Sequence, residues 1–243
     1  MIPRIKPNIG WREIFALFLT EKNSVSKFER EFAEKFDTVD AVAFPYGRSA
    51  QWAFLKALEI KNAEIILPAY TCSVVAHAIT LSENEPCFVD IVLDDYNMDL
   101  DIVEAKINQN TRAIIATHTF GYPQDIDRLE EIIRKAEQRF GHKIWLMQDC
   151  CHAFSAKWKG KMIGTSGDVA VYAFNISKHM TSIFGGMLTF QDKTIADKVR
   201  QWRDDNFKTP SWRKAFLRRL YLMAVFIAFN QYLYVITWFL QKK

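Results

Sequence analysis

The sequence predicts an α/β protein in which a mostly parallel β-sheet is covered by helices on both faces, a three-layer sandwich. Short apolar runs alternate with segments of helical periodicity between residues 25 and 174, an order typical of this class. Several runs are apolar throughout, as expected for parallel strands buried on both faces. With 243 residues, 49% of them hydrophobic, the chain can bury the core that such a sheet needs.

The first expected elements follow a short proline-bearing arm. Residues 25–36 carry apolar side chains at every third or fourth position with charges between them, which predicts a helix. Residues 41–44 form a short apolar run and are expected to be a strand. A turn at residues 47–49 then leads into an expected helix over residues 50–60.

The same alternation continues through the middle of the chain. Residues 64–67 are an apolar run that Pro68 closes. The other expected strands cover residues 86–91, 111–117, 143–147 and 168–174, and the other expected helices cover residues 73–82, 102–107 and 126–140. This order predicts parallel strands joined by crossover helices.

The composition favours a cytoplasmic protein without a nucleic-acid partner. The formal net charge is only +4, and no long basic run is interleaved with aromatic residues. The four cysteines, Cys72, Cys87, Cys150 and Cys151, form no CxxC pair and are expected to be reduced thiols. The amino terminus lacks the apolar core of a signal peptide. The acidic residues 90–99 are interpreted as a solvated loop, so no metal site is expected.

Two residues of opposite charge follow two of the expected strands. The apolar run at residues 144–149 ends in Asp149, and Lys178 lies just past the run at residues 168–174. Ligands of such sheets bind outside the carboxyl ends of the strands. Pyridoxal phosphate (PLP) chemistry requires this pair, because the lysine forms the Schiff base and the acid partners the pyridinium nitrogen. Either residue alone is more typical of a solvated loop or a helix cap.

Further polar residues are expected at the same edge. Gly47, Arg48 and Ser49 open a helix directly after a strand, where backbone N–H groups and a hydroxyl suit a phosphate. An ordinary serine cap is the alternative. His152 is a candidate to stack on the cofactor ring or to hydrogen-bond to it, with a buried structural histidine as the alternative. His118 also follows a strand and is interpreted as structural.

Several short motifs occur together in this order. They are Gly47-Arg48-Ser49-Ala50, Pro68-Ala69-Tyr70-Thr71-Cys72, Val89-Asp90-Ile91, His118-Thr119-Phe120-Gly121, Gln148-Asp149-Cys150-Cys151-His152-Ala153, and Gly167-Asp168 followed by Lys178 and Gly185-Gly186. With them the chain resembles the DegT/DnrJ/StrS-type sugar aminotransferases, from the amino-terminal arm to about residue 206. Any one motif is weak, whereas the set is specific.

The resemblance implies a fold, a cofactor and a reaction. The fold is the large domain of fold type I PLP-dependent transferases, that of aspartate aminotransferase. Lys178 is the implied catalytic residue. The implied cofactor contacts are Asp149, His152, Gly47, Arg48, Ser49, Tyr70, Cys72, Asn175 and Ser177. The implied enzyme is a homodimer that transfers an amino group from an amino-acid donor to a nucleotide-linked keto sugar.

Three positions depart from the family pattern. Many relatives have an aromatic residue at the position of Cys72, where it stacks on the cofactor ring. Cysteine cannot stack in this way, so Tyr70 or His152 is the candidate substitute. Ala173 and Asn175 stand where relatives often have serine and histidine. These changes bear on the substrate class more than on the cofactor.

The carboxyl-terminal segment also departs from the family. Relatives continue into a small domain, and residues 207–243 are expected to be the helical start of a truncated one, after a PLP-binding large domain at residues 1–206. Residues 220–240 carry no charge and are expected to form one helix. Its length suits a bilayer, but Asn230 and Gln231 lie in its middle. Packing on a missing domain or a second subunit is therefore favoured over a membrane.

Three functions stay open from the sequence. The leading hypothesis is a PLP-dependent aminotransferase acting on a nucleotide-linked keto sugar, for cell-surface polysaccharide or secondary-metabolite synthesis. The alternative is a non-catalytic or membrane-associated remnant of the same fold. A PLP-dependent sugar dehydratase is disfavoured, because such relatives replace the lysine with histidine, whereas Lys178 is present here.

Overall fold

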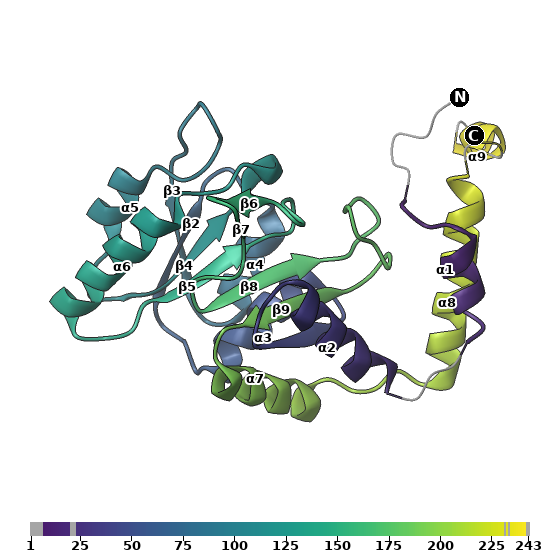
Figure 1. Ribbon diagram of the computed structural model, residues 1–243, viewed down its shortest axis with the longest axis horizontal. Coiled ribbons are helices and arrows are strands. Elements are labelled where there is room, and N and C mark those ends of the chain that lie inside the picture. Colours follow the sequence, from purple (N-terminus) through teal and green to yellow (C-terminus); the bar gives the residue numbers. More distant parts are fainter. Residues whose placement is uncertain (1–6, 20–22, 231, 233, 242–243) are drawn as a thin grey trace.

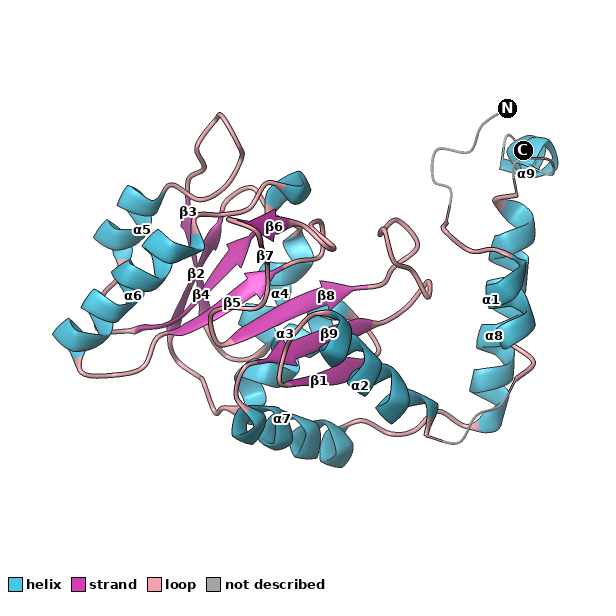
Figure 2. Cartoon of the chain, in the orientation of Figure 1, coloured by secondary structure: helices cyan, strands magenta, loops and turns pink. Residues whose placement is uncertain are grey.

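The structure, a computed structural model, describes residues 7–19, 23–230, 232 and 234–241. It contains one large sheet with helices on both faces (Figures 1 and 2). The seven strands lie in the order β1-β9-β8-β5-β4-β2-β3. Their bounds are β1 (Asp40–Phe44), β2 (Glu64–Pro68), β3 (Glu85–Val89), β4 (Thr111–Thr117), β5 (Trp145–Asp149), β8 (Val169–Ala173) and β9 (Gly186–Phe190). The short strands β6 (Lys157–Trp158) and β7 (Lys161–Met162) form a separate hairpin.

The sheet is mostly parallel, as predicted. Strand β9 runs antiparallel to both of its neighbours, β1 and β8, whereas β8, β5, β4, β2 and β3 are parallel to one another. In the register of β4 and β5, Thr117 pairs with Asp149, the last residue of each strand. The strand ends that carry the candidate site residues therefore meet at one edge.

Alternate side chains of the strands enter separate apolar layers, which gives the predicted sandwich. On one face, Ile65 and Ile115 pack with α3 (Gly47–Ala57), α4 (Ser73–Leu81) and α7 (Lys193–Asn206). On the other face, Ile66 and Ile114 pack with α5 (Leu100–Lys106) and α6 (Ile126–Phe140). Helix α2 (Ser24–Lys35) covers the rest of that second face, beside β8 and β9. We call residues 23–207 the body.

Local capping explains why some boundaries match the prediction so closely. Helix α6 begins where the side chain of Asp125 accepts a hydrogen bond from the N–H of Arg128 at 3.0 Å, and it ends at Gly141, which has a φ of 71°. Its expected span, residues 126–140, is confirmed. The expected strand at residues 143–147 instead covers Trp145–Asp149, so Asp149 is itself the last strand residue.

The turn expected at residues 47–49 is wrong, because these residues form the first turn of α3. The helix can start this early because its first residue has no side chain. A Cβ on Gly47 would lie 2.9 Å from the Cβ of Ala173. Glycine thus lets the amino terminus of α3 approach the end of β8 closely.

The single helix expected at residues 220–240 is also wrong. Two helices occur instead, α8 (Trp212–Ala228) and α9 (Tyr234–Gln241). Between them, Asn230 accepts a hydrogen bond through its side chain from the N–H of Tyr232 at 3.0 Å, and through its carbonyl from that of Tyr234 at 2.8 Å. Asparagine favours such caps over helix interiors. Gln231 lies outside the described residues.

Helices α8 and α9 stand apart from the sheet, and α1 (Trp11–Ala16) lies beside α8 (Figures 1 and 2). The rings of Trp11 and Phe226 meet edge to face with centroids 5.1 Å apart. We call α1, α8 and α9 together the arm. Within the described part of the chain, no helix is both long enough and apolar enough to cross a membrane.

Candidate active site

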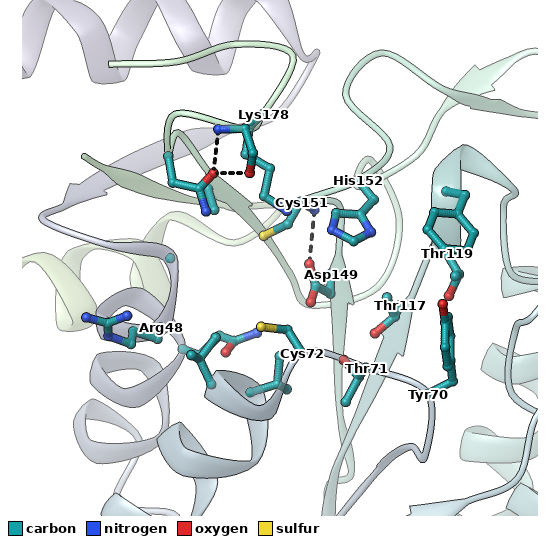
Figure 3. Close-up of a pocket in the computed structure, with 18 residues that line it drawn as sticks. Arg48, Tyr70, Thr71, Cys72, Thr117, Thr119, Asp149, Cys151, His152 and Lys178 are labelled. Atoms are coloured by element: carbon teal, nitrogen blue, oxygen red, sulfur yellow. Dashed lines mark hydrogen bonds between the residues drawn. The ribbon is translucent and has the colours of Figure 1, made fainter. Parts of the chain in front are cut away.

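A cavity of about 460 Å³ lies at the carboxyl edge of the parallel strands, a volume typical of small-molecule sites. Most of the predicted site residues line it: Gly47, Arg48, Tyr70, Cys72, Asp149, His152, Asn175, Ser177 and Lys178 (Figure 3). Ser49, in the first turn of α3, is not among the described residues that line it. The structure thus brings the lysine, the acid and a helix amino terminus to one cavity.

The acid of the site is held by the backbone that follows it. Asp149 is buried, and its Oδ1 accepts a hydrogen bond from the N–H of Cys151 at 3.0 Å. The Asp149 carbonyl accepts another from the N–H of His118 at 3.2 Å. These bonds fix the carboxylate at the junction of β4 and β5, directed into the cavity (Figure 3).

His118 has the structural role that the sequence predicted. It is fully buried; its Nδ1 accepts from the N–H of Gln124 at 3.0 Å, and its Nε2 therefore donates to Oε1 of Gln148 at 2.9 Å. Burial lowers the pKa of His118 to about 4. The Nε2 of Gln148 in turn donates to the carbonyl of Ser166 at 2.7 Å. This neutral network fixes the end of β5 just before the acid.

The loop that carries Lys178 is shaped by its own polar residues. The Oδ1 of Asn175 accepts hydrogen bonds from the N–H of Ser177 at 3.1 Å and from its hydroxyl at 2.8 Å (Figure 3). The carbonyl of Asn175 accepts from the N–H of Lys178 at 3.0 Å. Asn175 and Ser177 therefore form a compact turn that presents the lysine at the cavity.

The amino terminus of α3 faces the cavity from the other side of the sheet edge. Its N-cap, Tyr46, is extended, so the first N–H groups of the helix have no intrahelical partners. A Cβ on Gly186 would lie 2.5 Å from the nitrogen of Gly47, so both positions require glycine. The guanidinium of Arg48 lies 4.7 Å from the centre of the Tyr46 ring and points away from Asp149 (Figure 3). The free backbone N–H groups at this helix start, more than the arginine, could therefore bind an anion.

Aromatic residues form the rim of the cavity. Tyr70 is 48% exposed, and its ring lies 6.0 Å from that of Phe120. The His152 ring stacks on Phe120 with centroids 6.1 Å apart and planes 13° apart. Burial, and then the positive charge of Lys178, lower the pKa of His152. At neutral pH this histidine is an uncharged ring at the cavity wall.

The two pocket cysteines differ. Cys72 is exposed and forms the N-cap of α4, a second helix whose amino terminus faces the cavity. Cys151 is shielded, and burial together with the nearby Asp149 carboxylate raises the pKa of its thiol. Cys151 is therefore a neutral, compact wall residue rather than a nucleophile.

Comparison with known proteins decides the family. The family model of the DegT/DnrJ/EryC1/StrS aminotransferases matches residues 16–230. The chain belongs to this family. The GDP-perosamine synthase of Escherichia coli O157:H7 is 34% identical over 182 residues, which cover 74% of this chain and 48% of that protein. The chain spans about half the length of the curated relatives that it matches.

Solved structures of other proteins share the fold. A sugar aminotransferase from Micromonospora echinospora has a TM-score of 0.78 at 26% identity, covering 88% of this chain and 60% of that one. A Streptococcus pneumoniae protein in its PLP form has a TM-score of 0.77 at 25% identity, covering 87% of this chain and 59% of that one. The expected fold, a PLP-dependent transferase large domain, is confirmed.

Two threonines that the sequence reasoning missed as site residues also line the cavity. Thr117 and Thr119 line the cavity beside Asp149, at the end of β4 and just after it. Both are buried, and among the described residues neither hydroxyl has a hydrogen-bond partner. Their place at the end of a predicted strand was a signal for them, but their burial was not visible in the sequence.

Proposed function

We propose that this chain contains the cofactor-binding part of a PLP-dependent aminotransferase, which transfers an amino group from an amino acid to a nucleotide-linked keto sugar. One observation carries the proposal: Lys178, Asp149 and the amino terminus of α3 open into a single cavity. The similarity to a GDP-perosamine synthase supports a nucleotide-sugar substrate. The product would serve cell-surface polysaccharide or secondary-metabolite synthesis.

The residues that line the cavity have the chemical groups needed to bind PLP. When bound, PLP supplies an aldehyde carbon and an electron-accepting ring. The amine of Lys178 is the group that bonds such an aldehyde, Asp149 suits the ring nitrogen, and the first N–H groups of α3 suit the phosphate. The hydroxyls of Thr117 and Thr119, which have no partner in the described part of the chain, also indicate a polar ligand in the cavity.

Asp149, Lys178 and His152 are proposed to differ in how each holds, moves or lacks a proton. The Asp149 carboxylate keeps a proton on the ring nitrogen. With PLP bound, the Lys178 amine would take a proton from the α-carbon of the amino donor and, in the second half of the reaction, would give one to the sugar carbon that receives the amino group. His152 is uncharged because burial and Lys178 lower its pKa, so it would not repel a positively charged ring nitrogen.

A covalent label tests the proposal. The purified chain mixed with PLP should absorb visible light, and borohydride should then fix a pyridoxyl group on Lys178, identified by peptide mass spectrometry. Lys178→Ala should abolish the label, whereas Lys208→Ala, outside the cavity lining, should keep it. A stable label on another residue in Lys178→Ala would refute the assignment, and a wild-type chain that binds no PLP would favour the non-catalytic remnant.

A substitution at the acid tests its separate role. Asp149→Asn should retain PLP but lose most transamination, because an amide does not stabilise the proton on the ring nitrogen. Half-reaction rates with an amino-acid donor, followed by the change in cofactor absorption, measure this effect. Near-normal turnover would contradict the role proposed for Asp149.

The expected partners follow from the same proposal. A second copy of the chain is proposed as a subunit partner, and the cytoplasm as the place of action. The apolar surface of the arm suits this second subunit or the small domain of longer relatives. Sedimentation of the chain at several concentrations tests the dimer, and a single species with the monomer mass would contradict it.

A further inference from the structure

Two buried hydroxyls in the cavity have no hydrogen-bond partner among the residues that the structure describes, although nearly every buried polar group in proteins has one. Thr117 and Thr119 line the cavity and are only 7% and 3% exposed. Within the described part of the chain, neither Oγ1 has a hydrogen-bond partner. An unpaired buried hydroxyl lowers stability, so these two indicate a ligand atom that the cavity is built to receive.

The order of the strands decides which side of a ligand these hydroxyls meet. Strand β5 lies between β4 and β8, and β9 and β1 follow beyond β8. The amino terminus of α3 comes directly after β1 and packs against the end of β8 through Gly47. Thr117 pairs in register with Asp149. The acid therefore lies between that helix start and the two threonines along the sheet edge.

The covalent structure of PLP limits how its ring can lie between these groups. Its ring nitrogen and its aldehyde-bearing carbon are opposite each other, and the phosphate arm and the 3-oxygen lie on opposite edges of the ring. If the phosphate is at α3 and the nitrogen at Asp149, the edge with the 3-oxygen faces β4. That oxygen is the remaining polar atom of the ring, and it accepts hydrogen bonds.

We propose that Thr117 and Thr119 bind the 3-oxygen edge of the PLP ring. This inference rests on the proposed function. Hydroxyl donors stabilise the ionised form of the oxygen, since a hydrogen bond to a charged group is among the stronger ones. The neutral ring of His152 lines the same cavity and completes a polar wall without adding charge.

Valine substitutions of the full chain test the proposal, because valine keeps the shape of threonine and removes its hydroxyl. PLP affinity is measured by titration of fluorescence and of visible absorption, and the absorption is followed against pH. Thr117→Val, Thr119→Val or both should weaken PLP binding by about tenfold per hydroxyl that binds the oxygen. The pH midpoint of the visible band should also rise, because the ionised oxygen loses donors.

A matched control lies elsewhere in the sheet. The hydroxyl of Thr189 in β9 is likewise buried and unpaired among the described residues, but Thr189 does not line the cavity. Thr189→Val should leave both PLP affinity and the pH midpoint unchanged. Before PLP is added, all four valine variants, the double one included, should melt at or above the wild-type temperature, which shows that they fold.

An analogue identifies the ligand atom. The wild type and the double valine variant should bind 3-deoxypyridoxal 5′-phosphate, which lacks the oxygen, with equal affinity. A double variant that binds PLP as tightly as the wild type, with the same pH midpoint, would overturn the inference while leaving the proposed function intact. A wild-type chain that binds no PLP would overturn both.

Discussion

The body and the arm contain helices of similar length that bury very different surfaces. Helix α6 has 15 residues, and five of them are buried: Ile126, Leu129, Ile132, Ile133 and Ala136. Helix α8 has 17 residues and buries only Val225. Its exposed side chains include Trp212, Phe216 and Leu217. The body thus completes its own core, whereas the arm presents apolar surface that the described residues leave uncovered.

The body and the arm also differ in the contacts that hold their helices in place. Helix α7, the last of the body, is tied to it by an ion pair between Arg203 and the buried Glu29 and by a second between Arg200 and Asp40 at 2.7 Å. The arm meets the body at the ring of Phe184, which stacks on Tyr221 at 5.6 Å. Phe184 lies in the loop that carries Lys178, although it is not among the described residues that line the cavity. The arm therefore contacts this loop without helping to form the core.

The largest expected effect is a difference in stability between substitutions of two phenylalanines, one in the body and one in the arm. Phe54 in α3 is 0% exposed and Phe216 in α8 is 53% exposed. Phe54→Ala should reduce the free energy of unfolding by about 3–5 kcal/mol, because it removes packed atoms and leaves a cavity. Phe216→Ala should change it by less than about 0.5 kcal/mol. Urea unfolding followed by circular dichroism measures both, and equal losses would show that the arm is part of the core.

The next effect is a pH dependence that originates in the body. His118 is neutral in the fold, since burial lowers its pKa to about 4, whereas the unfolded residue titrates near 6.5. The unfolded state therefore binds more protons between these values, and stability falls as pH falls. From pH 7.5 to pH 5, the histidine should cost about 2 kcal/mol of unfolding free energy.

Variants isolate this histidine from the carboxylates that also titrate. His118→Gln should flatten the pH dependence, whereas His77→Gln, at an exposed position of α4, should not. The ring resonances of His118 in the wild type provide a second measurement that requires no variant. Titration of that ring with a midpoint above pH 6 would contradict the buried, neutral assignment.

The two regions also differ in how well the sequence predicted them. In the body, apolar periodicity, caps such as Asp125 and glycines such as Gly141 act locally, so the span of α6 could be predicted. The same apolar criterion failed in the arm. An uncharged run does not reveal where one helix ends, and Asn230 separates two helices by hydrogen bonds that the run does not show.

The candidate site shows a similar limit. Residues that bear obvious chemistry at strand ends, such as Lys178, Asp149 and His152, were predicted and line one cavity. Thr117 and Thr119 were missed as site residues, because an unpaired hydroxyl is a property of tertiary burial rather than of residue type. Ser49 was included for its hydroxyl, but the close approach of Gly47 to β8 starts the helix earlier.

A shortened chain tests whether the body is independent of the arm. Phe207 packs against Phe44 and Trp52 in the body, so the cut belongs after it. A chain of residues 23–208 should stay folded and unfold within a few degrees of the full chain, because the buried clusters remain intact. It should also be more soluble, since it lacks the exposed apolar side chains of α8. Increased aggregation or loss of cooperative melting would contradict this.

The smallest expected effect is at the contact between the two regions. The Tyr221 ring stacks on Phe184 at 5.6 Å, and an aromatic pair of this kind contributes about 0.5–1.5 kcal/mol. Tyr221→Ala should therefore leave the melting of the body almost unchanged but loosen the loop that carries Lys178. Hydrogen exchange measures this, because the N–H of Lys178 is bonded to the carbonyl of Asn175 and should exchange up to about tenfold faster. Phe216→Ala, on the same helix, should leave that rate unchanged. Equal rates in the wild type and Tyr221→Ala would show that the arm touches the loop without stabilising it.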